Sequence, residues 1–275
     1  MEYTHKPVDE LSFTDDFMFG TVMKNKTICK GVIERLLHIK VGKIEYPSLQ
    51  KTITPFYESK GIRLDVYVSD PDRVFDIEIQ TSVPPDLPKR TRYYQSLMDV
   101  DNLLRGQSYA ELKESYVIFI CTQDPLDKGL PVYTFENTCR EESGLSLKDK
   151  TAKVFYNASA YAKEKNGELH ALLRYLCEKR ATSHFTQTID GLVESTKNNE
   201  KFRSVYMSLN IHKDDLIRQG SLIGEKIGFE KGDIIIQIAE ENIKNMDDFN
   251  KALASAKGKK TLVWVNRGGL FQGLV

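Results

Sequence analysis

Apolar and polar residues alternate most clearly between positions 61 and 80. Apolar residues stand at every second position in the runs 62–69 and 75–80, which is the period of two expected for half-buried strands. Between the runs lies Asp70-Pro71-Asp72-Arg73. Pro presets φ at the second position of a turn, and an Asp at the first can accept a hydrogen bond from the backbone two residues on. The pattern predicts a β-hairpin.

The predicted hairpin brings two acidic side chains together. With Pro71 and Asp72 at its apex, Asp65 faces Glu78. Opposed Cβ atoms lie about 4.5–5.5 Å apart, and like charges at that distance destabilise a sheet. A divalent cation reverses the sign, since Mg²⁺, with Mn²⁺ as an alternative, is held by carboxylate oxygens and water. The alternative interpretation is a solvated polar face on an ordinary hairpin.

Other elements follow from the same patterns. Before the hairpin we expect two short helices, with Ser12 and Thr14 as candidate N-caps, and a strand within 44–56. After a proline-rich loop, a helix is predicted to run to about Arg105. The remaining expectations are a buried strand at 116–121, short strands at 132–135 and 154–157, and helices at 168–177 and 189–209.

The first turn of the helix after the hairpin carries Lys89, Arg90 and Arg92. Cations at a helix N-terminus oppose the helix dipole, so an anion is expected there to offset them. A phosphate suits both the N-terminal N–H groups and the arginine side chains. The alternative is that these residues are solvated surface charges.

These segments together resemble a known family. Arg63-Leu64-Asp65, then Ile77-Glu78-Ile79-Gln80, preceded by Phe13-Thr14-Asp15-Asp16-Phe17-Met18-Phe19 and followed by Arg92-Tyr93-Tyr94-Gln95 and Tyr116-Val117-Ile118-Phe119-Ile120-Cys121, are similar in order and spacing to the PD-(D/E)XK nuclease superfamily. Within it, the resemblance is to the branch of transposases and recombination-promoting nucleases, over about residues 10–215.

The resemblance implies a fold and a chemistry. The implied fold is α/β, a restriction-endonuclease-like core of helix, three strands, helix and strand with a mixed sheet flanked by helices. The implied activity is Mg²⁺-dependent DNA endonuclease, with Asp65, Glu78 and Gln80 as catalytic residues. The metal ligands would be Asp65, Glu78, the backbone carbonyl of Ile79 and Asp16, and Arg90, Arg92 and Gln95 would contact DNA. Glu34 is a second candidate for the carboxylate of the first helix.

The chain departs from the superfamily at Gln80, where the superfamily pattern has Lys. Gln occurs at this position within the resembled branch, and it can orient water but carries no charge. Slow or tightly regulated cleavage is therefore expected. Two alternative functions follow, namely a catalytically weak or inactive DNA-binding or assembly protein, and an adaptor that recruits partners through its C-terminal module.

The last stretch carries two patterns. Gly220, Gly224, Gly228 and Gly232 repeat every four residues, as in the tails of this nuclease branch, whereas 228–238, 245–253 and 260–267 resemble the later part of a PDZ domain. We therefore expect a nuclease-like domain at 1–219 and a partial PDZ-like or glycine-repeat module, a small α+β appendage, at 220–275.

Composition adds few constraints. Basic and acidic residues balance at 39 each, so DNA affinity must come from local patches. The four cysteines lie far apart, and the sequence has no leader pattern and no long apolar run, so a cytoplasmic protein that does not bind membranes is expected. The expected partners are DNA, a second copy of the chain and a protein bound by the C-terminal module.

Overall fold

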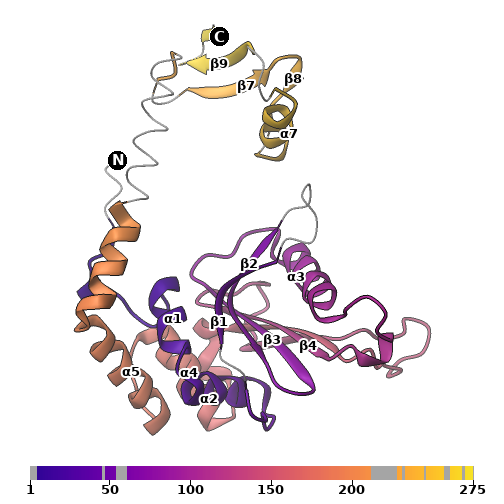
Figure 1. Ribbon diagram of the computed structural model, residues 1–275, viewed down its shortest axis with the longest axis vertical. Coiled ribbons are helices and arrows are strands. Elements are labelled where there is room, and N and C mark those ends of the chain that lie inside the picture. Colours follow the sequence, from indigo (N-terminus) through magenta and orange to yellow (C-terminus); the bar gives the residue numbers. More distant parts are fainter. Residues whose placement is uncertain are drawn as a thin grey trace. The chain divides into compact units, whose positions relative to one another are not determined.

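The computed structural model describes residues 5–44, 47–53, 61–211, 228–230, 233–244, 246–256, 261–267 and 270–274 (Figure 1). The chain divides into two compact units, one of Lys6–Ser204 and one of Met1–His5 with Val205–Val275. Each unit is considered by itself. The domain boundary predicted near Gly220 lies outside the described residues, as do Gly224 and Gly232.

The larger unit is built around one mixed sheet. Its elements are η1 (Val8–Glu10), α1 (Asp16–Met23), α2 (Lys26–Leu37), β1 (Ser48–Ile53), β2 (Ile62–Ser69), β3 (Arg73–Gln80), α3 (Leu87–Asn102), η2 (Tyr109–Glu111), β4 (Glu114–Cys121), β5 (Val132–Phe135), β6 (Thr151–Asn157), η3 (Ala158–Lys163), α4 (Gly167–Glu178) and α5 (His184–Lys197). The strand order is β1-β2-β3-β4-β6-β5. β3 and β4 run parallel, as do β4 and β6, and the other neighbours are antiparallel. The predicted α/β class and core order are confirmed.

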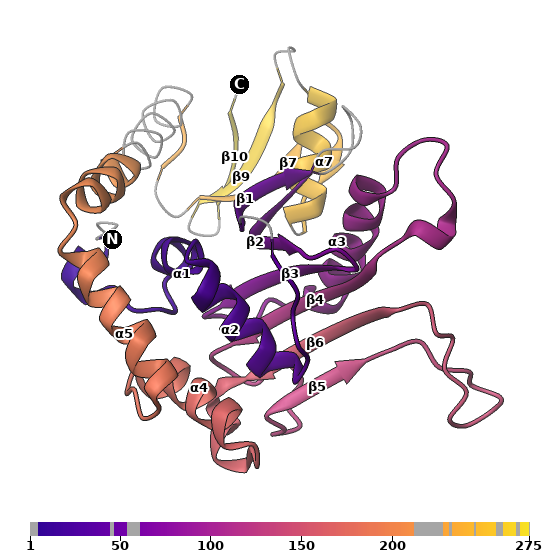
Figure 2. The same cartoon turned by 60° about the horizontal axis from the view of Figure 1, so that its bottom comes forward.

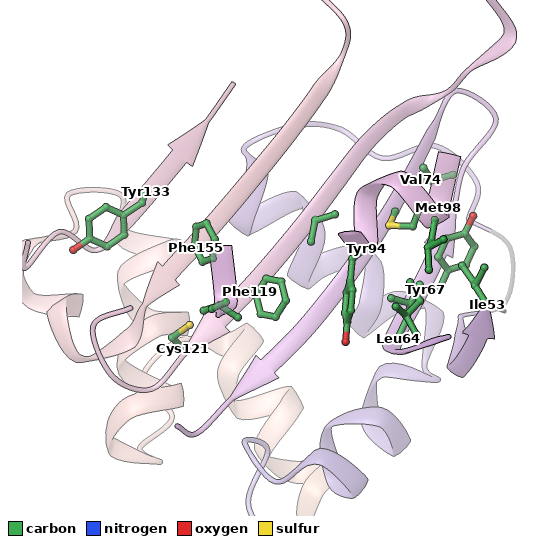
Figure 3. Packing of buried hydrophobic residues seen from close by; sticks show 14 residues of the cluster. Ile53, Leu64, Tyr67, Val74, Tyr94, Met98, Phe119, Cys121, Tyr133 and Phe155 are labelled. Atoms are coloured by element: carbon green, nitrogen blue, oxygen red, sulfur yellow. The ribbon is translucent and has the colours of Figure 1, made fainter. Parts of the chain in front are cut away.

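Helices cover both faces of this sheet, with α3 on one side and α1, α2 and α4 on the other (Figures 1 and 2). Under α3, a continuous apolar layer joins Met98 and Tyr94 to Phe119 and Phe155 (Figure 3). On the opposite face the Tyr156 hydroxyl donates to the Leu36 carbonyl in α2. β3 is a central strand, so its side chains are buried on both faces.

The turn between β2 and β3 follows the predicted chemistry. The Asp70 Oδ1 atom accepts the N–H groups of Asp72 (3.0 Å) and Arg73 (2.8 Å), and the Asp70 N–H donates to the Arg73 carbonyl (2.9 Å). The Asp70 carboxylate also pairs with the Arg73 guanidinium at 2.8 Å, and the Asp70 side chain is almost fully buried. Asp70 therefore fixes the closed end of the hairpin.

Several predicted helix boundaries are wrong. The N-caps of α1 and α2 are Asp15 and Asn25, not Ser12 or Thr14. α3 ends at Asn102, before Arg105, because the Asn102 amide donates to the Met98 carbonyl and competes with the helical pattern.

The predicted helix at 189–209 is also wrong as a single element. It is divided between α5 and a helix at 200–211, and the break lies at Asn198 and Asn199. The Asn199 side chain accepts the Phe202 N–H and begins the second helix.

The smaller unit contains a second sheet of strand order β10-β9-β7-β8. Its elements are β7 (Ile234–Ile238), β8 (Glu241–Asn242), α7 (Met246–Ala256), β9 (Val263–Arg267) and β10 (Leu270–Leu274). Arg267 donates to both carboxylate oxygens of Asp233 and so ties the start of β7 to the end of β9. β7, α7 and β9 overlap the segments 228–238, 245–253 and 260–267, and β8 and β10 lie outside them.

We predict that Asp70→Ala destabilises the larger unit by about 1–3 kcal/mol, because it removes the acceptor of two turn N–H groups and the partner of Arg73. Urea unfolding measures the effect. Asp72→Ala is the matched control, since Asp72 is exposed at the apex of the same turn. Equal stability of the two variants would contradict the role given to Asp70.

Candidate functional site

Two carboxylates meet at the open end of the β2–β3 hairpin. The backbone ladder pairs Ser69 with Val74 and Tyr67 with Asp76, and its last pair is Val66 with Ile77. Beyond that pair, the carboxylates of Asp65 and Glu78 accept hydrogen bonds from backbone N–H groups. The Asp65 N–H donates to Glu78 Oε1 at 2.8 Å, and the Ile79 N–H donates to Asp65 Oδ2 at 3.3 Å. Each carboxylate thus binds the backbone of the facing strand.

The burial of β3 differs from the half-buried strand that alternation predicted. Glu78 and Asp76 both have 0% of their surface exposed. They share a face because they are two residues apart on one strand. That face is covered by α3, so the polar side of the hairpin is interior at this strand. The interpretation of a solvated polar face is therefore wrong for Glu78.

Asp76 is the residue that the sequence analysis missed. Both of its carboxylate oxygens are buried without a hydrogen-bond partner among the described residues. Burying a polar group without a partner costs free energy, and an ionised carboxylate costs far more than a neutral one. The available signal was its place two residues before Glu78 on a strand expected to neighbour a fully apolar one.

Burial and mutual repulsion change the pKa values of all three acids. Burial, followed by the nearby Asp16 carboxylate, raises the pKa of Asp65 to about 6. Burial and the Asp65 carboxylate raise the pKa of Glu78 to about 8, and Arg90 only partly opposes them. Burial, Glu78 and Asp65 raise the pKa of Asp76 well above its ordinary value. A cation at this site would favour the ionised forms.

Arg90 forms an ion pair with Glu78 and is only partly exposed to solvent. Its Nη2 donates to Glu78 Oε2 at 2.9 Å, and its Nε donates to the Tyr94 hydroxyl at 2.8 Å. Its guanidinium lies 4.9 Å from the centre of the Tyr94 ring and 5.5 Å from that of Phe119. The interpretation of a solvated surface charge is therefore wrong for Arg90. Arg92, on the same helix, is exposed.

The other predicted residues differ in whether they contact this pair, and Gln95 and Glu34 contact residues elsewhere in the larger unit. Gln80 is half-buried at the end of β3, and Asp16 is exposed at the start of α1. Ile79 contacts the site through its N–H, which Asp65 accepts. Gln95 is 5% exposed, and its amide donates to the Ser115 carbonyl (3.1 Å) and hydroxyl (3.3 Å). Gln95 therefore joins α3 to β4 in the interior, and its contact with DNA stays a prediction. Glu34, the other candidate of the first helices, accepts the Val41 N–H.

The donor set fits a hard divalent cation. Mg²⁺ needs one or two carboxylates and keeps several waters, and each oxygen of Asp65 and Glu78 has a lone pair left after its present hydrogen bond. Among the described residues, no three His, Cys, Asp or Glu side chains form a ready-made metal cage. Two carboxylates with water, and not an all-protein cage, are what these residues can provide.

The model of one protein family, described as PD-(D/E)XK nuclease family transposase, matches residues 13–172, more than half of the chain. The chain belongs to this family. No curated protein and no solved structure matches it. The six-stranded mixed sheet with flanking helices is the restriction-endonuclease-like fold that the family implies.

The match to this nuclease family runs from Phe13, before α1, to Leu172 in α4, so it includes every strand of the larger sheet. The assignment of Asp65, Glu78 and Gln80 to the positions of the PD-(D/E)XK pattern stays a prediction from the sequence. Nucleases of this superfamily generally use divalent metal ions. In the part of the chain that the structure describes, no helix is both long and apolar enough to cross a membrane.

The raised pKa values predict how stability changes with pH. Between about pH 4 and pH 8 the folded protein binds more protons at Asp65 and Glu78 than the unfolded chain, so this contribution to stability is full below about pH 4 and is lost as the pH rises through about 6 and then about 8. Urea unfolding in EDTA at about pH 5 and about pH 9 measures the loss.

The matched variant for this measurement is Glu78→Gln, which cannot titrate at this position. The variant also removes the Glu78 charge that raises the pKa of Asp76, so the difference between the two proteins reports Glu78 together with its effect on the neighbouring acids. We expect the wild type to lose more stability than the variant as the pH rises. Parallel losses would contradict the raised pKa of Glu78.

Proposed function

We propose that this protein is a metal-dependent DNA endonuclease. The observation that supports the proposal best is that Asp65 and Glu78 meet at the open end of the hairpin. Burial and mutual repulsion disfavour the ionised forms of these two acids. Structural acids are usually exposed or paired with cations, whereas acids brought together in spite of repulsion are typical of functional sites. Membership of a nuclease family agrees with this interpretation.

In the proposed site, Asp65 and Glu78 hold Mg²⁺, or Mn²⁺ in its place. Asp16 and the Ile79 carbonyl are the candidates for further ligands. When bound, the metal makes water acidic enough to act as a nucleophile and stabilises charge on the phosphoryl oxygens. The protein's part is positional, since backbone N–H bonds from both strands fix the two carboxylates.

Hydrolysis forms one bond from a water oxygen to phosphorus and breaks one phosphorus–oxygen ester bond. The water gives up one proton and the leaving oxygen takes one. Gln80, half-buried at the end of β3, would orient the water by hydrogen bonding, but an amide neither accepts the proton nor adds a positive charge. Arg92 is exposed on α3 and is the candidate for an outer phosphate contact.

A second candidate function is a catalytically weak or inactive DNA-binding or assembly protein. The amide at Gln80 favours it, as does Glu78, whose two oxygens already accept hydrogen bonds from Asp65 and Arg90. A third candidate function is an adaptor that recruits a protein through the C-terminal unit. Self-association and a cytoplasmic location are proposed with the endonuclease function. Metal-dependent cleavage separates the endonuclease from the other two candidates.

We predict that Asp65→Asn reduces Mg²⁺-dependent nicking of a plasmid at least about 100-fold, because it removes one of two metal-binding charges. Its melting temperature in EDTA should equal or exceed that of the wild type, since a repelling pair is relieved. Asp72→Asn, an exposed acid on the same hairpin, is the control and should cut normally. A variant that cuts as fast as the wild type would remove Asp65 from the site.

For Arg92 we predict a role in DNA affinity and not in turnover. Arg92→Gln should weaken binding to all DNA sequences alike and lower the slope of log affinity against log salt concentration by about one unit. Binding is measured in Ca²⁺ with a labelled duplex. Arg105→Gln, which removes an exposed arginine beyond the end of α3, is the control. An unchanged slope would mean that Arg92 is a solvated surface charge that does not contact DNA.

A further inference from the structure

Arg90 lies between a buried acid and solvent. Its side chain is 29% exposed, whereas that of Glu78, which it contacts at 2.9 Å, is 0% exposed. The second contact, to Tyr94, fixes the guanidinium from the other side, and Tyr94 itself is 8% exposed. The inner end of Arg90 is thus fixed, while its outer part reaches the surface of the site.

The guanidinium has donors left for a ligand. Its two hydrogen bonds use two of the five N–H groups of an arginine, so three remain without a partner among the described residues. Arginine is suited to this double role because its planar fork donates in several directions and stacks on aromatic rings, as it does here on Tyr94 and Phe119. A lysine ammonium offers no such plane.

Arg90 also acts on both members of the acid pair. Burial raises the pKa of Asp65, and Arg90 is among the cations that oppose the rise. Arg90 reaches Glu78 from α3, above the face of β3 on which Gln80, two residues after Glu78, also lies. The positive group absent from the strand at position 80 is therefore present on the helix above it.

We propose that Arg90 supplies the positive group of the catalytic centre that Gln80 cannot supply, by pairing with Glu78 in the metal-free protein and by donating to a phosphoryl oxygen when Glu78 holds the metal. This proposal rests on the nuclease function proposed above. In the hydrolysis described there, Arg90 transfers no proton, since a guanidinium stays charged at every ordinary pH. It stabilises the negative charge that develops on the phosphoryl oxygens.

The proposal predicts that loss of Arg90 raises metal affinity and lowers the cleavage rate. A cation beside Glu78 repels a divalent metal, so Arg90→Gln should bind Mn²⁺ about tenfold more tightly than the wild type in the absence of DNA. The same variant should cleave DNA at least about 100-fold more slowly at saturating Mg²⁺, because the transition state loses its donor. A residue with only a structural role would not tighten metal binding while it slows cleavage.

The decisive variant moves the charge back to the strand. The double variant Arg90→Gln/Gln80→Lys places an ammonium at the position of the superfamily lysine. We expect single-turnover cleavage within about tenfold of the wild type and Mn²⁺ affinity close to that of the wild type. Arg105→Gln is the control for loss of one arginine charge and should match the wild type in both measurements.

The experiment combines calorimetric titration with Mn²⁺ and single-turnover cleavage of a duplex in Mg²⁺. The proposal is overturned if Arg90→Gln binds Mn²⁺ no more tightly than the wild type, or if the double variant cleaves no faster than Arg90→Gln. If Arg90→Gln does not fold, Arg90→Lys takes its place and should retain wild-type Mn²⁺ affinity and cleavage within about tenfold. A loss as large as 100-fold in Arg90→Lys overturns the proposal.

Failure of the nuclease function is distinguishable from failure of this proposal. A wild-type protein that cuts no DNA in any metal contradicts the endonuclease function. The Mn²⁺ titrations of the wild type, Arg90→Gln and the double variant still decide whether Arg90 competes with a metal at Glu78. Tighter binding in Arg90→Gln, reversed in the double variant, supports Arg90 as the cation of the site.

Discussion

The burial of acidic side chains beside one another is the constraint on which the rest of the structure depends. Taking an ionised carboxylate out of water costs several kcal/mol even after the protein relaxes around it. Asp65, Asp76 and Glu78 lie close together in the sheet, and among the described residues only Glu78 forms an ion pair there, with Arg90. Apolar residues would fill the same space at lower cost, so folding alone does not account for these acids. The proposed metal would offset their charge.

The surrounding elements make this arrangement persistent. Asp70 closes the far end of the hairpin with hydrogen bonds to the turn, so β2 and β3 separate only at the end that carries the acids. β4 lies beside β3 in parallel register, with Phe119 opposite Glu78. α3 then packs over this layer and brings Arg90 to the carboxylate. The site is thus positioned by a tight turn, a central strand and one helix.

Local turn and strand structure could be predicted from the sequence. Which side chains the helices bury could not. The hairpin, its register and the Asp70 turn follow from alternation and from one Asp-Pro pair, which act over a few residues. The burial of Glu78 depends on α3 lying across β3, and the contact between Glu78 and Arg90 depends on the angle of that helix. Gln95 illustrates the same limit. A polar residue on a helix is expected to be exposed from the sequence, whereas in the structure Gln95 is buried against Ser115. Asp76 was missed for the same reason, since alternation shows which residues share a face and not what covers it.

A count of charges indicates why an uncharged residue is tolerated at position 80. Two ionised carboxylates and one divalent cation sum to zero, and a phosphodiester then adds one negative charge that grows as the attacking oxygen approaches. A lysine on the strand would offset that charge. With Gln80 the sum stays negative unless a cation comes from another element, and Arg90, which Tyr94 also holds, contacts Glu78. Arg90 also pairs with Glu78 before a metal binds. In the proposed mechanism, one residue therefore offsets both the free-energy cost of burying Glu78 and the negative charge of the transition state. A lysine at position 80, on a strand end that is half-buried, would not have the aromatic support that fixes a guanidinium here.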